Sequence, residues 1–336
     1  MSILPYTRKI QKIGESFFIS LPKSWIERSG LGRGDAVTIV ETQNGSLSLR
    51  GESRRREPRE ITLIVEENEP IRSLRRRLTG AYVDGFDIIR LKSEKGFSDE
   101  QNDAIRWITD ELFGLEIVEL SSQQIVIQCL LAKTFPAEGM IEGIHRTIKS
   151  MFNDVILALE QRNNARAQSV IRRTRYVKRL SLMVHRLLRS LIAFPGEIND
   201  KIKPIDSVDF LRVIERITEI SGSVRRVAES ILAMKNEVDE HVRRELINLC
   251  DRILKMYDDS IRALMNRDVQ LANNVIDGEI EFTDLLNYLM KSDNKISISA
   301  STFPFIHRII DNLERIGIYA VEIAEIAIDR AEETPQ

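Results

Sequence analysis

An internal repeat in the C-terminal part of the chain restricts the possible folds more than any other feature of the sequence. Apolar residues at helical spacing predict six long helices, at residues 138–161, 164–193, 206–235, 239–266, 268–291 and 302–332. At an offset of 105 residues, without a gap, Ala158, Leu159, Arg162, Ala167, Val170 and Ile171 match Ala263, Leu264, Arg267, Ala272, Val275 and Ile276. Long helices with short connections pack as antiparallel bundles. We therefore expect two tandem three-helix bundles, at about 138–235 and 239–332.

The net charge of −2 conceals four blocks of opposite sign. Counting Lys, Arg, Asp and Glu gives +4 over residues 1–60, −5 over 61–139, +8 over 140–195 and −9 over 196–336. Segregation of this kind is typical of modules with different partners. The cations of the predicted helix 164–193 suit phosphate, DNA or an anionic membrane surface. Its apolar residues have helical spacing and are assigned to the core.

Several classes of protein are excluded. No apolar run approaches the 18 residues of a membrane span, and the first residues lack a signal-peptide core, so we expect a cytoplasmic protein. Cys129 and Cys250 are far apart in apolar surroundings and are expected to be small buried side chains. The four histidines show no zinc-site spacing, and no phosphate-binding or nucleophile motif occurs. We therefore do not expect an enzyme.

The first 52 residues are predicted to form a small β module. Strands are expected at 7–13, 17–22, 36–40 and 46–50, with a short helix at 23–29 and a hairpin turn at Asn44-Gly45. So small a module buries little core and needs a disulfide, a metal or a second chain to be stable. Because it has neither cysteine nor histidine, oligomerisation is the remaining route.

The residues of this module resemble the AbrB/SpoVT/MazE DNA-binding family. The resemblance rests on Arg8-Lys9-Ile-Gln-Lys12-Ile-Gly14-Glu-Ser16, on Ile19-Ser-Leu-Pro22-Lys23 and on Gly30-Leu-Gly-Arg-Gly34-Asp35-Ala-Val37. It implies a swapped-hairpin β-barrel built from two chains, of which this chain supplies half. It also implies that DNA is bound by Arg8, Lys9, Lys12 and Lys23, with Ser16 in the loop that shapes the surface. On charge alone, these cations could instead be a solvated edge that discourages strand aggregation.

A charged linker at 53–59, with Arg54-Arg55-Arg56, leads into a predicted α+β domain at 60–134. Its strands are expected at 61–65, 87–91, 116–120 and 124–128, and its helices at 70–82 and 98–113. Ser98 and Gln101 are predicted to form a capping box at the second helix. The expected division is therefore 1–52, 53–59, 60–134 and 135–336.

The helical part resembles PhoU, a phosphate-uptake regulator built from two three-helix repeats. The resemblance rests on the repeat, on Leu313-Glu314-Arg-Ile-Gly317 and on Ile214-Glu215-Arg-Ile-Thr-Glu219. It implies metal clusters held by carboxylates four residues apart on one helix face. Glu215 and Glu219 keep such a pair, whereas Ile318 replaces the second carboxylate after Glu314. The candidate metal ligands are Glu279, Asp284, Glu314, Glu215 and Glu219.

Two alternatives to a divalent or iron-type metal remain open. Asp277 and Asp284 are acidic where their repeat mates Arg172 and Arg179 are basic. Cations of helix 164–193 could therefore replace a metal opposite Glu215 and Glu219, the candidates being Arg172, Arg175, Lys178 and Arg179. In the other alternative these faces are simply solvated.

These observations favour a homodimeric, DNA-binding transcriptional regulator of phosphate uptake, with the PhoU-like helices as sensor or relay. The alternative is a signalling adaptor that binds a phosphate transporter ATPase or a sensor kinase and uses the β module only to dimerise.

Overall fold

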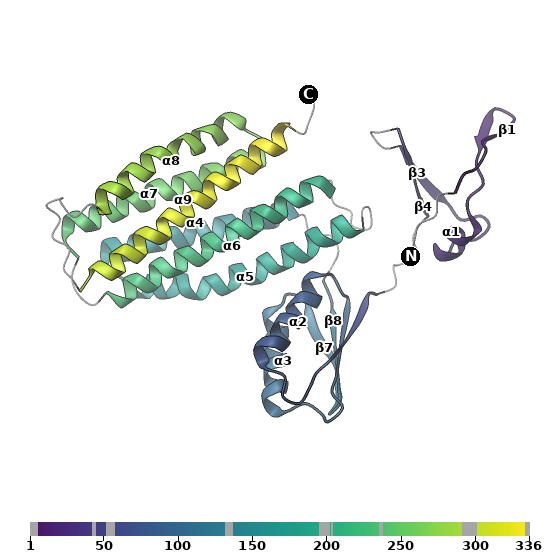
Figure 1. The fold of residues 1–336 in the computed structure, drawn as a ribbon, viewed down its shortest axis with the longest axis horizontal. Coiled ribbons are helices and arrows are strands. Elements are labelled where there is room, and N and C mark those ends of the chain that lie inside the picture. The colour runs from purple at the N-terminus through teal and green to yellow at the C-terminus, as the bar shows by residue number, and fades with distance from the viewer. Residues whose placement is uncertain are drawn as a thin grey trace. The chain divides into compact units, whose positions relative to one another are not determined.

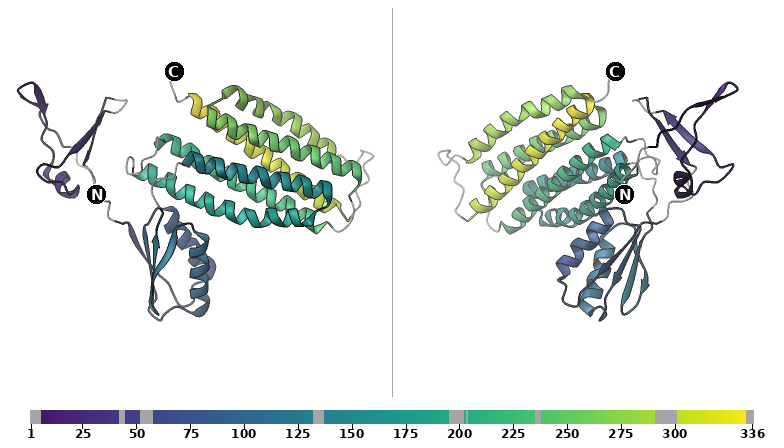
Figure 2. Two further views of the ribbon diagram at one scale, coloured as in Figure 1. Left: turned by 180° about the vertical axis from the view of Figure 1, so that it is seen from behind. Right: turned by 45° about the vertical axis from the view of Figure 1, so that its right-hand side comes forward.

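The computed structural model describes residues 6–41, 45–51, 58–131, 137–194, 202, 204–234, 238–290 and 301–332, with the helix at 280–290 described by its backbone alone. The chain divides into two compact units, Met1–Pro58 and Arg59–Gln336 (Figures 1 and 2). The predicted turn residue Asn44 and the Arg54-Arg55-Arg56 run lie outside the described residues. The finer boundaries predicted within 59–336 stay a prediction.

The N-terminal unit contains two separate antiparallel hairpins and a short helix. Strands β1 (Gln11–Ile13) and β2 (Ser16–Phe18) pair, and β3 (Val37–Glu41) pairs with β4 (Leu47–Gly51). Helix α1 (Lys23–Arg28) lies between the hairpins in the chain. Gly14 and Gly34 have φ of 65° and 94°, which is the left-handed region that their turns require. The order of the predicted elements is thus confirmed, whereas the two-chain barrel stays a prediction.

The α+β segment contains a four-stranded sheet with helices α2 (Ile71–Val83) and α3 (Asp99–Glu111) on one face (Figure 2). Its strands are β5 (Glu60–Ile64), β6 (Ile88–Lys92), β7 (Leu115–Leu120) and β8 (Gln124–Cys129), in the order β5-β6-β8-β7. Only the β5–β6 pair is parallel. The predicted capping box is confirmed, since Ser98 Oγ accepts from the Gln101 backbone N–H and the Gln101 side chain accepts from the Ser98 N–H.

The rest of the chain is helical. Its helices are α4 (Ala137–Gln161), α5 (Asn164–Ala193), α6 (Pro204–Ala233), α7 (Glu240–Asn266), α8 (Val269–Met290) and α9 (Phe303–Glu332). Helix α6 begins at Pro204, two residues before the predicted start at 206, so Asp206 lies inside its first turn. Proline suits a first helical position, where its missing N–H would have no partner. Among the described residues, no helix has the length and apolarity of a bilayer span.

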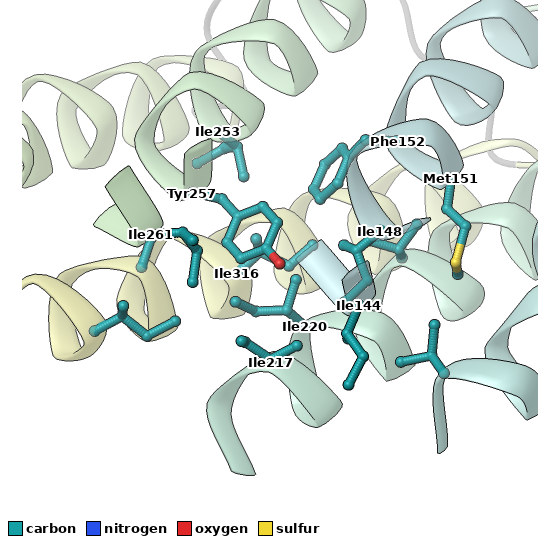
Figure 3. Close-up of a cluster of buried hydrophobic side chains, with 14 of the residues drawn as sticks. Ile144, Ile148, Met151, Phe152, Ile217, Ile220, Ile253, Tyr257, Ile261 and Ile316 are labelled. Carbon is teal, nitrogen blue, oxygen red and sulfur yellow. The ribbon is translucent and has the colours of Figure 1, made fainter. Parts of the chain in front are cut away.

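The two predicted three-helix copies pack together around one core. Helices α4, α5 and α6 contact one another, α8 and α9 pack with α7, and the pairs α4–α7 and α6–α9 join the halves. Figure 3 shows the centre, where Phe152 of α4 and Tyr257 of α7 lie among isoleucines of four helices. The repeat mates Arg162 and Arg267 both have φ of 54°, so the same left-handed residue follows α4 and α7.

Helix α5 also carries the contact with the α+β segment. The buried Arg186 guanidinium donates to the carbonyls of Tyr82 and Phe86, at 2.6 and 2.9 Å. Further along the same face, Arg175 pairs with Glu111 at 2.7 Å and Arg189 with Asp84 at 2.6 Å. Part of the +8 charge of residues 140–195 is therefore neutralised by carboxylates of the α+β segment.

We predict that Arg186→Met destabilises the chain by about 3 kcal/mol, because two buried carbonyls lose a charged donor. Arg189→Met removes an exposed ion pair and should cost less than about 1 kcal/mol. Urea denaturation of both variants tests this difference, and equal losses of stability would contradict it.

A titratable cluster lies at the α4–α7 contact. His145 Nε2 is 3.0 Å from Asp258 Oδ1, and Lys149 Nζ donates to Asp258 Oδ2 at 2.8 Å. Burial lowers the pKa of the His145 imidazole below its ordinary 6.5, although Asp258 acts in the opposite direction. The neutral imidazole is therefore the folded form at neutral pH. Its Nε2–H donates to the carboxylate, which has no proton to give.

Because this pKa is lowered, the free energy of unfolding is predicted to decrease as the pH is lowered. The unfolded chain binds a proton at His145 more readily, so the contribution of the neutral imidazole is complete above pH 6.5 and is lost as the pH falls through the folded-state pKa. Urea denaturation between pH 7.5 and 5 should show a smaller pH dependence for His145→Gln than for the wild type. The exposed His241→Gln is the control, and an equal effect of both substitutions would refute the assignment.

Candidate functional site

The five predicted DNA-contact residues are all exposed and lie close together in the sequence. Arg8 and Lys9 precede β1, Lys12 lies on β1, Ser16 begins β2 and Lys23 begins α1. The register of the hairpin places Lys12 directly opposite Phe17, and the Lys12 ammonium lies 6.0 Å from the centre of that ring.

Two contacts position the cations at the ends of this segment. The Tyr6 hydroxyl lies 3.0 Å from Ser24 Oγ, which ties the stretch containing Arg8 to helix α1. Lys23 pairs with Glu27 one turn later at 3.7 Å, and both side chains are well exposed. Asp35 accepts from the Gly32 N–H at 2.7 Å, which helps to order this turn. Exposed cations of this kind can track a phosphate backbone.

The described apolar side chains of the N-terminal unit are not packed into a buried core. None of the described side chains in this unit is buried, and Trp25 and Leu31 are half-buried. Phe17 is 72% exposed, Ile10 71% and Leu47 66%. Hairpins with unburied apolar faces are marginal alone in water. The unit therefore offers both a charged surface and an apolar surface to partners.

The first pair of metal candidates lines a groove of about 300 Å³ between α5 and α6. Glu215 and Glu219 come from α6, whereas Lys178 and His185 come from α5. Burial lowers the pKa of the His185 imidazole, and Glu215 opposes that shift. Arg216, in the same groove, pairs with Glu322 of α9. A cation in the wall thus accompanies the two carboxylates.

The second-repeat metal candidates are described only in part. Glu279 is half-buried on α8, Glu314 is exposed on α9, and the Asp284 side chain lies outside the described residues. Within the described part of the chain, no three His, Cys, Asp or Glu side chains converge as metal ligands. Hard cations need about six oxygens. Because the Asp284 side chain lies outside the described residues, the metal site stays a prediction.

The ion-pair alternative stays a prediction. Lys178 shares the groove with Glu215 and Glu219. Arg175 and Arg179 instead turn toward the α+β segment, where Arg175 pairs with Glu111 and Arg179 lies 4.3 Å from the centre of the Phe113 ring. Sequence reasoning missed Arg75, Arg76 and Glu111 beside them, although the arginine-rich run at 72–77 on a predicted helix was a usable signal.

Comparison with known proteins agrees with this architecture. The PhoU domain model matches residues 141–231 and 246–327, one stretch in each three-helix half. The model "Antidote-toxin recognition MazE, bacterial antitoxin" matches residues 10–57. A comparison with curated proteins finds no match.

Two solved structures share the helical fold. The phosphate transport system regulatory protein PhoU from Streptococcus pneumoniae is 16% identical, with a TM-score of 0.51 over 57% of this chain and 91% of that one. PhoU from Pseudomonas aeruginosa is 17% identical, with a TM-score of 0.51 over 59% and 96%.

Both predicted resemblances are thus confirmed. The two PhoU matches together span just over half of the chain, and the MazE match covers most of the N-terminal unit. The chain therefore belongs to the PhoU family and carries a MazE-type domain at its N-terminus.

Proposed function

We propose that this chain is a dimeric DNA-binding regulator of phosphate uptake, in which the PhoU-type helices sense or relay a signal. The observation that carries the proposal is the exposed set of Arg8, Lys9, Lys12 and Lys23 on a MazE-type unit. A dimer doubles these four cations to eight on one assembly. The connection with phosphate comes from the PhoU domains, since a similar solved structure is described as a phosphate transport system regulatory protein.

The proposed dimer follows from the unburied apolar side chains of the head, which we define as residues 6–51. Among the described residues, its two hairpins form separate two-stranded sheets. Phe17 and Leu47 are therefore expected to pack against a second copy, because burying apolar area is the main favourable term in association. A second copy also brings the two sets of cations onto one DNA duplex.

The first test is the salt dependence of DNA binding by the full chain. If the dimer neutralises about six phosphates, log K should fall with log salt at a slope of about −5. The Arg8→Gln/Lys12→Gln variant removes four cations per dimer, so its slope should be about −2. Lys95→Gln, an exposed cation of the other unit that pairs with Glu67, is the matched control.

Titration of phosphate-operon promoter DNA at several salt concentrations, followed by fluorescence anisotropy, gives these slopes. A change in slope as large for Lys95→Gln as for the double variant would contradict the assignment of Arg8 and Lys12 to the DNA-binding surface. Binding to a transporter ATPase without DNA affinity would instead support the adaptor function, with the head used only to dimerise.

The second test concerns the dimer. We expect the wild-type chain of 38.6 kDa to sediment at twice that mass. Leu47→Asp should favour the monomer, because a carboxylate in an apolar interface must lose its hydration. Ile64→Asp is the control, since Ile64 is also exposed and apolar but lies on β5 of the other unit. A dimer that survives Leu47→Asp in analytical ultracentrifugation would refute this interface.

A further inference from the structure

A second pocket, of about 270 Å³, lies where α5 meets the helices of the α+β segment. Arg75 and Arg76 come from α2, Glu111 from α3, and Arg175, Lys178 and Arg179 from α5. The pocket thus gathers five cations and one carboxylate. Its size suits a small ligand and excludes a duplex or a protein segment.

The single carboxylate is occupied by two of the cations. Glu111 accepts from Arg75 at 2.8 Å and pairs with Arg175 at 2.7 Å. The same two guanidinium groups lie 4.6 and 5.7 Å from the centre of the Trp107 ring. These contacts fix both arginines in place, and fixed guanidinium forks match the oxygens of a phosphate group.

The other three cations have no carboxylate partner among the described residues. Arg76, Lys178 and Arg179 line the pocket without an ion pair there, and the buried Nε of Arg179 has no hydrogen-bond acceptor in that part of the chain. Arg76 and Lys178 are exposed and Arg179 is half-buried, so water screens their mutual repulsion only in part. An anion of more than one charge would remove this repulsion and supply the missing acceptors.

We propose that this pocket binds a small phosphate oxyanion, either inorganic phosphate or the phosphoryl group of a small metabolite. Binding would join the α+β segment more firmly to α5, since the ligand would contact cations from both. A role for the ligand as effector of a regulator rests on the proposed function, whereas binding itself does not.

The test uses the full chain and isothermal titration with inorganic phosphate and with a sugar monophosphate. Saturable binding of either is expected, and the tighter ligand identifies the source of the phosphate group. Lys178→Gln and Arg76→Gln should each weaken binding about tenfold, because each removes a charged hydrogen-bond donor. Arg172→Gln removes an exposed cation of α5 that does not line the pocket, and it should change affinity less than about twofold.

Both lining side chains lie at the pocket surface, and a circular dichroism melt of each variant shows whether it folds. In the wild type, saturating phosphate should also raise the melting temperature. Absence of binding to either ligand would overturn the proposal, as would equal weakening by Arg172→Gln. DNA binding by the same preparations is measured separately. Its loss would count against the proposed function and not against the phosphate pocket.

Discussion

The second unit depends on the contacts that the arginines of α5 make with the α+β segment. Val177, Val184 and Leu188 of this helix are buried in the bundle core, while Arg175, Arg186 and Arg189 reach the α+β segment. One rigid helix of 30 residues therefore belongs to both parts. Any ligand that changes the charges along this face of α5 acts on the bundle and on the sheet together. The groove between α5 and α6 and the proposed phosphate pocket share Lys178, which places Glu215 and Glu219 beside the proposed phosphate site.

The head, in contrast, does not bury its apolar side chains against the rest of the described chain. Its two hairpins carry aromatic and aliphatic side chains that remain exposed, and its cations pair little within the described residues. The proposed dimer would give these apolar side chains a core. Coupling between the two units requires that a ligand or partner bind two states of the protein with different affinity. The proposed oxyanion pocket supplies one ligand whose binding can differ between such states.

The sequence predicts the elements well because the signals involved are local. The period of the apolar residues placed α5 at the residues where it is found, and Ser98 with Gln101 formed the predicted capping box. The repeat was also readable, and Arg162 and Arg267 confirm it in the backbone. Ion pairs between residues far apart in the sequence could not be predicted. Glu111 and Arg175 are 64 positions apart, so nothing local showed that part of the +8 block is neutralised within the chain. Similarly, nothing local showed that α6 begins at Pro204, before the predicted start at 206, or that Asp206 lies near Arg267 and Arg330.

The central claim is that a MazE-type head and a PhoU-type body act as one regulator on DNA. Genome-wide mapping of DNA occupancy, in phosphate-rich and phosphate-poor cells, measures this most directly. The account predicts enrichment at promoters of phosphate-uptake genes, with an occupancy that differs between the two conditions. Absence of enrichment at every locus in both conditions would contradict it.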